Sequence, residues 1–591
     1  LGSWRATLIV AASIPLSILA AIAVLNMFGQ TLNAMTLGGL AIAIGILVDE
    51  ATVTIENIER HLGEGKSVTQ AIMDGASEIL IPVFVALLCI CIVFVPMFFL
   101  PGISGYLFVP MALAVVFAMV ASFLLSRTVV LTMSMYLLKP HSTDDSGHNS
   151  SAKHKGIFSP FVRFQKNFEH RFAQLRNSYT QSLAGVLATR KLFVMGFMGL
   201  VLVSFLLVPF LGRNFFPAVD SSSILMHVRM PSGIKIEESA ARFELIGRAV
   251  RELIPAEELD SIINNIGMPV SMLNVIYNTS GTVSAQDGDM MISLKPGYRA
   301  AEHIARLRQE LPLRFPATTF SFLPADITSQ ILNFGSPSPL DVQITGRNLS
   351  ANRAFAETLL RRINTIPGIA DARIQQPEST PQLNIDIDRS RISQYGITAR
   401  DVTTSLGASL AGTQQTSPVF YVNPANGVSY PVVAQVPEYL MANISDLENI
   451  PVSGAASNNT SPQHLGGLAS ITRSTTLPVV SQYNMQAMIN IFATTQGRDL
   501  GSVAADINAI IAELHDERPT GTNVTLRGQY QTMNIAFSGL GYGLLGAIVL
   551  IYFLIVVNFQ SWKDPFVIIS ALPAALAGIV WMLFVSFTPL S

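Results

Sequence analysis

The sequence predicts a polytopic α-helical membrane protein that carries one large α+β domain outside the membrane. First, half of the 591 residues are hydrophobic and only 13% are charged, whereas soluble domains carry about 25% charged residues; the mean hydropathy is +0.44. Second, seven segments are apolar over the roughly 20 residues that cross ~30 Å of hydrocarbon. Third, residues 213–535 alternate strand-like and helix-like patterns.

The predicted spans form a group of four, a single span after a polar linker, and a final pair. They are 8–28, 36–57, 79–100, 107–126, 192–212, 538–558 and 566–587. Lys and Arg predict orientation because short cytoplasmic loops are enriched in them. Loops 29–34 and 101–106 contain neither, whereas all nine Lys and Arg residues of 139–191 lie on the other side. We therefore expect a cytoplasmic N-terminus and an external domain.

The predicted organisation has six parts. They are spans (1–138), a cytoplasmic linker and helix (139–191), one span (192–212), two external subdomains (213–335 and 336–535) and two spans (536–591). From Phe161 to Tyr179, Phe, Leu and Tyr recur every three or four residues, with Lys and Arg on the other faces. This pattern predicts a basic amphipathic helix lying in the headgroup plane, with a soluble helix packed on a partner as the alternative.

The external domain repeats one order of elements. In each subdomain strand patterns such as "SSILMHVRM" and "PLDVQITG" alternate with amphipathic helices, which predicts two ferredoxin-like βαβ units. In the second unit "QLNIDIDR" is the next expected strand. Residues from about 411 to 482 interrupt this unit and are rich in Ser, Thr, Asn, Gly and Pro. We expect this insertion to form a β-rich docking lobe.

An internal repeat links the two ends of the chain. At an offset of 558 residues the matched positions are Ser3 and Ser561, Trp4 and Trp562, Arg5 and Lys563, and Pro15 and Pro573. Both copies run outward from the cytoplasmic face, so the repeat is parallel. It predicts an intact protein of two halves with about twelve spans and two external domains, of which this chain would hold the end of one half and most of the next.

The stretch "GLAIAIGILVDEATVTIENIERHL" places two adjacent carboxylates, Asp49 and Glu50, inside an apolar run. We call them the acid pair. A charged Asp at the centre of a membrane helix costs about 2.5–3.5 kcal/mol, and repulsion between close carboxylates favours protonation of one of them. Such a pair can take up a proton on one side and release it on the other; the alternative is a structural role in holding the bundle. Glu56 and Arg60, four residues apart, are predicted to pair at the cytoplasmic end.

Several other activities lack a sequence signal. No "GxxxxGK[ST]" motif is present, so the energy source is an ion gradient or a separate subunit. No Cys/His cluster has the spacing of metal ligands, Cys89 and Cys91 are predicted to be small core residues, and no cofactor is implied. A net charge of −2 suggests no nucleic-acid partner. Methionines at 268, 272, 290 and 291 raise the hypothesis of a soft-metal site, although Pro269 argues against a regular helix there.

Four stretches carry a family resemblance. They are "GILVDEATVTIENIERHL", "VFVPMFFLPGISGYLF", "PQLNIDIDRSRISQYGITARDVTTSLGASLAG" and "NFQSWKDPFVIISALPAA". The chain resembles the resistance-nodulation-division (RND) efflux permeases, in the branch that exports hydrophobic and amphiphilic compounds. The resemblance implies a homotrimer in the bacterial inner membrane with periplasmic porter and docking subdomains, a periplasmic adaptor and an outer-membrane channel. It also implies drug export by proton antiport, with Asp49 and Glu50 as the relay.

The chain departs from the family pattern at two places. The second acid is usually an aspartate and is Glu50 here, which leaves the proton stoichiometry and the choice between H⁺ and Na⁺ open. The phenylalanines of the family's substrate pocket are replaced in "GMPVSMLNVIYNTSGT". The candidate pocket residues of this chain are Met272, Leu273, Ile276, Tyr277 and Phe322. Alongside amphiphile efflux, a heavy-metal exporter of the same fold and a non-transporting membrane scaffold are the competing hypotheses.

Overall fold

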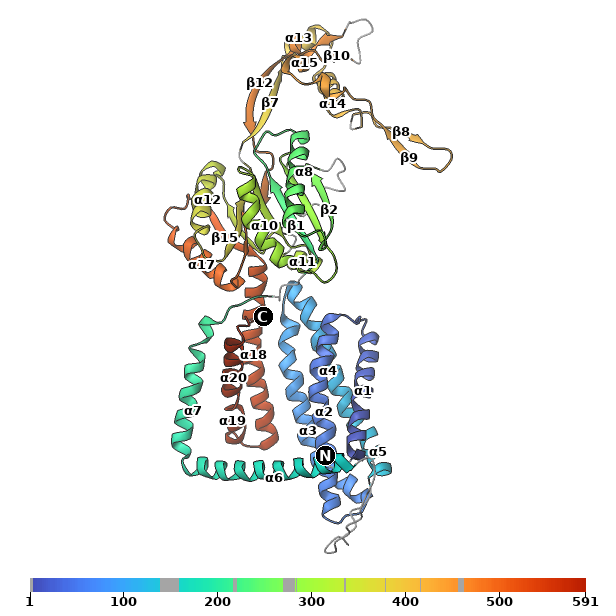
Figure 1. Ribbon diagram of the computed structural model, residues 1–591, viewed down its shortest axis with the longest axis vertical. Helices are drawn as coiled ribbons and strands as arrows, with labels where there is room; N and C mark the ends of the chain where they lie inside the picture. The colour runs from blue at the N-terminus through green and yellow to red at the C-terminus, as the bar shows by residue number, and fades with distance from the viewer. Residues whose placement is uncertain are drawn as a thin grey trace.

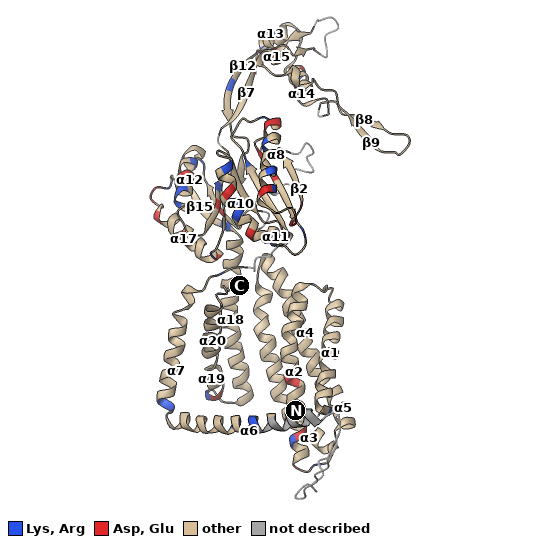
Figure 2. Cartoon of the chain, in the orientation of Figure 1, with Lys and Arg blue, Asp and Glu red and all other residues tan. Residues whose placement is uncertain are grey.

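The computed structural model consists of a helical bundle and an α+β domain stacked on one end of it (Figure 1). The structure describes residues 4–138, 159–215, 221–268, 282, 284–333, 336–377, 379–414, 416–454 and 462–590. Charged residues are concentrated in the α+β domain and near the opposite end of the bundle, and the bundle itself is almost uniformly uncharged (Figure 2).

Seven helices in the described residues are long and apolar enough to cross a membrane, which confirms the predicted number. They are α1 (Trp4–Met27), α2 (Ala34–Gly63), α3 (Val68–Phe94) with η1 (Val95–Phe99), α4 (Gly102–Arg127) with α5 (Val129–Leu137), α7 (Arg190–Phe205) with η2 (Val208–Phe210), α18 (Gln529–Phe559), and α19 (Lys563–Ile569) with α20 (Leu572–Val585). Each of the seven helices begins before its predicted span, because residues outside the apolar window continue as regular helix.

Helices α1, α2 and α4 form the most closely packed part of the bundle. Their shared core includes Leu25 of α1, Leu47 of α2 and Met119 of α4, each no more than 1% exposed. Gly39 lets α2 approach α4 closely, since a Cβ atom there would lie 2.6 Å from the Met111 carbonyl oxygen. This contact fixes the position of α2, the helix that carries the acid pair.

Helix α6 (Ser159–Ala188) lies across the end of the bundle opposite the α+β domain (Figure 1); we call this the α6 end. Phe168, Phe172, Leu175 and Tyr179 are each at least 58% exposed, and the rings of Phe168 and Phe172 stack 6.1 Å apart. A helix therefore forms where the sequence predicts one, with an uncovered apolar stripe. Its location in the headgroup plane stays a prediction.

The first subdomain of the α+β domain is a four-stranded antiparallel sheet with the order β2-β3-β1-β4. Its elements are β1 (Ser223–Arg229), α8 (Ile236–Leu253), β2 (Leu259–Ile266), β3 (Asp287–Leu294), α10 (Ala300–Arg314), β4 (Thr319–Leu323) and α11 (Ile327–Leu332). This is the strand order of a split βαβ, ferredoxin-like unit. Phe243 of α8 and Leu307 of α10 pack fully buried on the sheet.

The second subdomain repeats this arrangement, with β14 and β5 at the centre between β6 and β15. Its elements are β5 (Leu340–Thr345), α12 (Leu349–Ile363), β6 (Ile369–Ile374), β13 (Ser481–Tyr483), β14 (Gln486–Thr495), α17 (Leu500–Glu513) and β15 (Asn523–Gly528). Leu359 of α12 and Ile507 of α17 are fully buried against the sheet. The chain passes from β15 directly into α18, so this sheet and the bundle share a continuous backbone.

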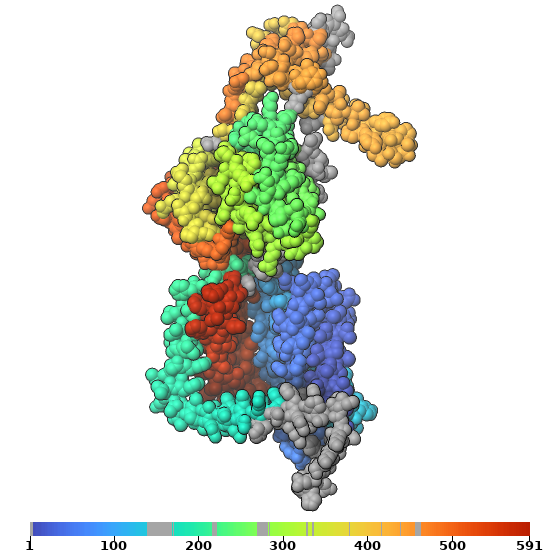
Figure 3. Space-filling view, viewed as in Figure 1, coloured from blue at the N-terminus to red at the C-terminus, as the bar shows by residue number. Residues whose placement is uncertain are grey.

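The insertion in the second subdomain begins earlier than the sequence pattern suggests. The predicted strand "QLNIDIDR" forms β7 (Thr380–Ile387), which pairs with β12 (Ala469–Thr476) in a two-stranded stalk rather than with the sheet. The stalk carries a distal lobe and a projecting hairpin arm (Figure 3). Elements of the lobe and arm are α13 (Arg389–Gln394), α14 (Ala399–Ala411), β8 (Val419–Val422), β9 (Ser429–Val432), η3 (Glu438–Leu440), α15 (Ile444–Glu448), β10 (Pro451–Val452), β11 (Gln463–His464) and α16 (Leu465–Leu468).

Candidate functional site

The acid pair lies midway along α2. The Asn33 side chain caps this helix by accepting a hydrogen bond from the Thr36 backbone N–H at 2.9 Å, and the helix then continues to Gly63 without a proline. Consecutive residues of a helix point about 100° apart. Glu50 is accordingly buried, at 8% exposed, whereas Asp49 is exposed in the described structure. The two carboxylates therefore occupy different environments.

Glu50 faces α4. The Ser122 hydroxyl and Arg127, both of α4, lie within electrostatic range of its carboxylate. Its Oε2 atom is buried and has no hydrogen-bond partner among the described residues. Sequence reasoning did not identify Ser122 or Arg127 as neighbours of the acid pair. A lone arginine within an apolar run is a signal that could have identified Arg127.

The predicted pair of Glu56 and Arg60 does not form. Glu56 is exposed, while Arg60 forms an ion pair with Glu78 of α3 and a second with Glu64 at 3.4 Å. The prediction considered only spacing along α2. Helix α3 brings Glu78 to the same end of the bundle, so that a carboxylate from the neighbouring helix is closer than the one four residues back.

Beside Arg60, His61 is buried between two carboxylates. Its Nδ1 and Nε2 atoms lie 3.1 Å from Glu64 and 3.0 Å from Glu78. Lys66 in turn lies 2.8 Å from Asp74 of α3. This charged cluster ties α2 to α3 at the α6 end of the bundle.

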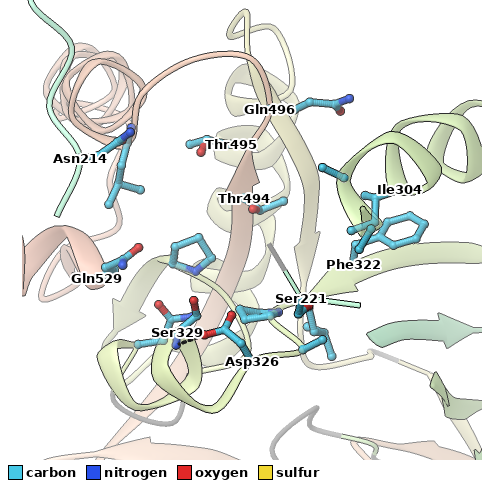
Figure 4. A pocket seen from close by; sticks show the side chains of 18 of the residues that line it. Asn214, Ser221, Ile304, Phe322, Asp326, Ser329, Thr494, Thr495, Gln496 and Gln529 are labelled. Atoms are coloured by element: carbon cyan, nitrogen blue, oxygen red, sulfur yellow. Dashed lines mark hydrogen bonds between the residues drawn. The ribbon is translucent and has the colours of Figure 1, made fainter. Parts of the chain in front are cut away.

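The candidate substrate pocket is described only in part. Met272, Leu273, Ile276 and Tyr277 lie outside the described residues. Phe322 is 7% exposed and lines a cavity of about 610 Å³ between the two subdomains. Figure 4 shows this cavity lined by Ile304 and Phe322 from the first subdomain, by Thr494 and Thr495 from the second, and by residues where the chain enters and leaves the domain. These last residues, Asn214 and Gln529, place the cavity at the base of the domain.

The cavity contains polar groups beside its apolar wall. Asn333 is 1% exposed, and neither side-chain amide atom has a hydrogen-bond partner in the described part of the chain. The Arg308 guanidinium lies 5.0 Å from the centre of the Phe322 ring. A site with a few polar groups on an apolar lining is typical of binding sites for small organic molecules.

Ionic contacts join the two subdomains beside this cavity. Arg308 of α10 donates to both carboxylate oxygens of Asp371 at 2.9 and 2.6 Å. Arg229 of β1 bonds to Asp287 at 2.6 Å and also donates to backbone carbonyls at the end of β6. Burial lowers the pKa of nearby Arg373 to about 10, with repulsion from Arg229 acting in the same direction. Arg373 thus remains charged at neutral pH within the interface.

The methionines do not converge in the described residues. Met290 is fully buried in the core of the first subdomain and pairs across the sheet with Met226. Met291 is 45% exposed on the opposite face, and Met268 is 52% exposed. Met272 lies outside the described residues. Adjacent strand residues point to opposite faces, so Met290 and Met291 cannot share a ligand.

Comparison with known proteins decides the family. The model of the AcrB/AcrD/AcrF family matches residues 1–591, the whole chain. The chain belongs to this family. Its members are RND permeases, and the resemblance inferred from the four sequence motifs is confirmed.

Curated relatives in the AcrB/AcrD/AcrF family include exporters of two kinds. The cation efflux system protein CusA of Escherichia coli (strain K12) is 25% identical over 98% of this chain and 53% of its own length. The nickel and cobalt resistance protein CnrA of Cupriavidus metallidurans is 26% identical over 100% of this chain and 53% of its own length. The multidrug resistance protein MdtC of Klebsiella pneumoniae (strain 342) is 25% identical over 100% of this chain and 54% of its own length. The chain therefore spans about half the length of the curated relatives it matches.

Solved structures agree on the fold. A crystal structure of a heavy metal efflux pump superposes with a TM-score of 0.74 at 24% identity, over 100% of this chain and 54% of that one. The RND permease fold, with apolar helices and a large α+β domain, is thereby established for this chain. At this identity the likeness carries the fold alone.

Proposed function

We propose that the protein is a permease of the bacterial inner membrane that uses an ion gradient to export hydrophobic or amphiphilic compounds, with H⁺ as the coupling ion. The observation that carries this proposal is the acid pair midway along the apolar helix α2. Carboxylates inside a membrane helix are costly, and in transporters they mark ion pathways and proton relays. A transporter has a use for such a pair that a scaffold does not.

The unequal environments of the two acids support a relay. Glu50 is buried beside polar groups of α4, and Asp49 is exposed. Asp49 can therefore exchange a proton with a group or with water outside the described helices. Glu50 is held in place beside it, and its charge responds to whether Asp49 carries that proton. Each proton binds at a carboxylate oxygen from one side of the membrane and leaves toward the other.

The cavity between the subdomains is our candidate for the substrate site. Its volume of about 610 Å³ suits a drug-sized molecule. The Phe322 ring offers an apolar surface, and the unpartnered amide of Asn333 offers a donor and an acceptor. In this proposal the α+β domain lies in the periplasm, and the permease works as a homotrimer with an adaptor and an outer-membrane channel.

The test is dye efflux from an efflux-deficient Gram-negative host that expresses the intact permease. We expect Asp49→Asn or Glu50→Gln to abolish efflux at matched membrane abundance, because neither replacement can bind and release a proton. Glu56→Gln, six residues along the same helix and exposed, is the matched control and should retain efflux. Efflux retained by both acid-pair variants would overturn the proposal and favour a structural role for the pair.

Cation export is the second candidate function, since CusA and CnrA are among the relatives. The separation of Met290 from Met291 counts against a methionine site formed by these two residues. Resistance assays with silver, copper, nickel and cobalt salts beside dyes and detergents distinguish the candidates. Protection against the metals alone would replace amphiphile export with cation export. The role of the acid pair would then be tested by the metal resistance of Asp49→Asn and Glu50→Gln.

A further inference from the structure

The place where α6 meets α7 carries positive charge without matching negative charge; we call it the α6–α7 corner. No Asp or Glu occurs from residue 170 to residue 219. All four basic residues of this stretch that belong to α6 or the start of α7 are exposed, and the structure shows no ion pair for any of them within the part of the chain it describes. They are Arg171, Arg176, Arg190 and Lys191. Figure 2 shows a basic segment at the start of α7, where it meets α6.

Other basic residues at the α6 end have acidic partners within the protein. Arg60 forms an ion pair with Glu78, and Lys66 forms one with Asp74 at 2.8 Å. The charges of the α6–α7 corner lack such a partner among the described residues. An anion that balances them therefore has to come from outside this part of the chain.

The two basic residues that begin α7 stand at the edge of the apolar span. The span Arg190–Phe210 contains 21 residues, which is about 31 Å at 1.5 Å per residue and matches the ~30 Å thickness of the hydrocarbon core. Arg190 and Lys191 therefore lie at the level of the phosphate groups when α7 crosses a bilayer.

Beside these two charges the surface of α7 is apolar and hollowed. Every residue from 190 to 200 is exposed, whereas Val201 and Ser204, in the half of α7 that hydrogen-bonds to α20, are buried. Within a membrane, an apolar helix surface that no protein covers is covered by acyl chains. The exposed part contains an open groove of about 430 Å³, lined by Arg190, Lys191, Val194 and Met195.

The apolar stripe of α6 leads to this groove. Its side chains recur every three or four residues and are 42–66% exposed. At 100° per residue, Arg171 and Arg176 point to opposite sides of the stripe. Basic residues beside an apolar stripe are typical of helices that lie on membranes containing anionic lipid. The stripe consists of Phe168, Phe172, Leu175, Tyr179, Leu183 and Leu187.

We propose that the α6–α7 corner is a binding site for an anionic phospholipid of the leaflet at the α6 end. Arg190 and Lys191 donate hydrogen bonds to the phosphate oxygens, and the first carbons of one acyl chain lie against Val194 and Met195. A zwitterionic phospholipid brings a cation to the same place, so the site prefers a headgroup with net negative charge. The inference concerns lipid binding and does not depend on which compound the permease exports.

The test measures lipid contact at the groove by fluorescence quenching. The intact permease is reconstituted in phosphatidylcholine bilayers that contain either dibrominated phosphatidylglycerol or dibrominated phosphatidylcholine, whose bromine atoms quench a tryptophan that they touch. Leu192→Trp is the reporter, because Leu192 is 73% exposed and does not line the groove. The difference between permease with and without this change isolates the reporter from the native tryptophans.

We expect phosphatidylglycerol to quench the reporter more strongly than phosphatidylcholine at equal mole fraction. Arg190→Gln with Lys191→Gln should lower this preference by about 25-fold, since one basic residue beside anionic lipid is worth about fivefold in affinity. Arg190→Lys keeps the charge and should retain the preference. Lys66→Gln is the matched control, because it removes one positive charge from the same end of the bundle but one that Asp74 already balances.

Each other result would overturn the inference. Equal quenching by the two lipids would show that the corner has no anionic preference, and absence of quenching by both would show that protein covers the groove. A preference that survives the double change would remove Arg190 and Lys191 from the site. An equal loss in Lys66→Gln would reduce the effect to general attraction by the charged surface. Should the double variant fail to fold, Arg190→Gln alone carries the same test with an expected loss of about fivefold.

Discussion

The contact of α2 with α4 at Gly39 allows a sharp test of how packing positions the acid pair. We consider Gly39→Ala, which adds a single methyl group. That Cβ would lie 2.6 Å from the Met111 carbonyl oxygen and 3.2 Å from the Ala114 Cβ. Both neighbours belong to α4, and one is backbone, so neither can rotate away.

The size of the effect follows from the geometry. Ordinary contact begins at 3.4 Å, so the helices must part by about 0.8 Å at this point, the difference between 3.4 and 2.6 Å. Overpacking of this kind costs about 1–3 kcal/mol. Glu50 follows Gly39 by eleven residues, which is close to three full turns; the two therefore share one face of α2. Separation of the helices at Gly39 should consequently loosen the contact of Glu50 with Ser122 as well.

The assay compares Gly39→Ala with Gly38→Ala, whose added Cβ would meet nothing within 4 Å. Both changes gain the same helix propensity, about 1 kcal/mol, so their difference reports packing alone. We expect Gly39→Ala to lower the melting temperature of the detergent-purified permease and to reduce dye efflux, and Gly38→Ala to do neither. Equal melting and equal efflux for the two variants would refute the argument that this contact positions the acid pair.

Two further predictions concern the α+β domain. Arg308→Met leaves the carboxylate of Asp371, which is 3% exposed, without its ion-pair partner. Hydrogen exchange of the β4 and β6 amides should then show that the local stability falls by about 3 kcal/mol. The control Arg248→Met breaks an exposed surface pair and should change the stability little. Burial raises the pKa of Asp341, so its stabilising contribution is complete at low pH and is lost as pH rises through the raised pKa. In the wild type, the protection of the β5 amides from hydrogen exchange should therefore fall as pH rises. Asp341→Asn should abolish this fall, because Asn does not ionise and Gln343 can turn its unpartnered Oε1 toward the new amide. A variant with the same pH profile as the wild type would contradict the prediction.

Apolar length and period predicted the parts of the fold that depend on local sequence. All seven apolar helices follow from runs that only lipid or a helical core can accommodate. The ferredoxin-like units follow from alternating amphipathic strands and helices, whose periods differ. The same local logic predicted a helix over α6. In each case the residues of one segment suffice to specify its structure.

Strand partners could not be predicted in the same way. The regular alternation of "QLNIDIDR" made it the best candidate for the second strand of the sheet, yet β6 takes that place and β7 joins the stalk. Strand β6 is short and contains Asp371 at a positive φ of 55°, which weakens its sequence signal. An alternating pattern shows that a segment is extended; which strand it pairs with depends on the register of chain far away in sequence.

The site was predicted in the same uneven way. Asp49 and Glu50 stand out because charge is rare in the spans, but their unequal burial depends on the rotation of α2 against α4. The partner of Arg60 was wrongly predicted because α3 supplies Glu78 from another helix. The cavity combines residues more than 300 positions apart, from Asn214 to Gln529. Such groupings arise only when the chain is folded.

Helix packing and one uninterrupted stretch of backbone connect the acid pair with the cavity. Helix α2 packs on α3, and α3 with η1 packs on α18. Helix α18 follows β15 without a loop, through Gly528 at a φ of 83°, where an added Cβ would lie 2.5 Å from the Pro339 carbonyl oxygen. Its first residue, Gln529, lines the cavity. A displacement of α3 that follows protonation on α2 would therefore reach the cavity wall through one continuous helix, because packed helices and a loop-free junction leave little room to absorb it.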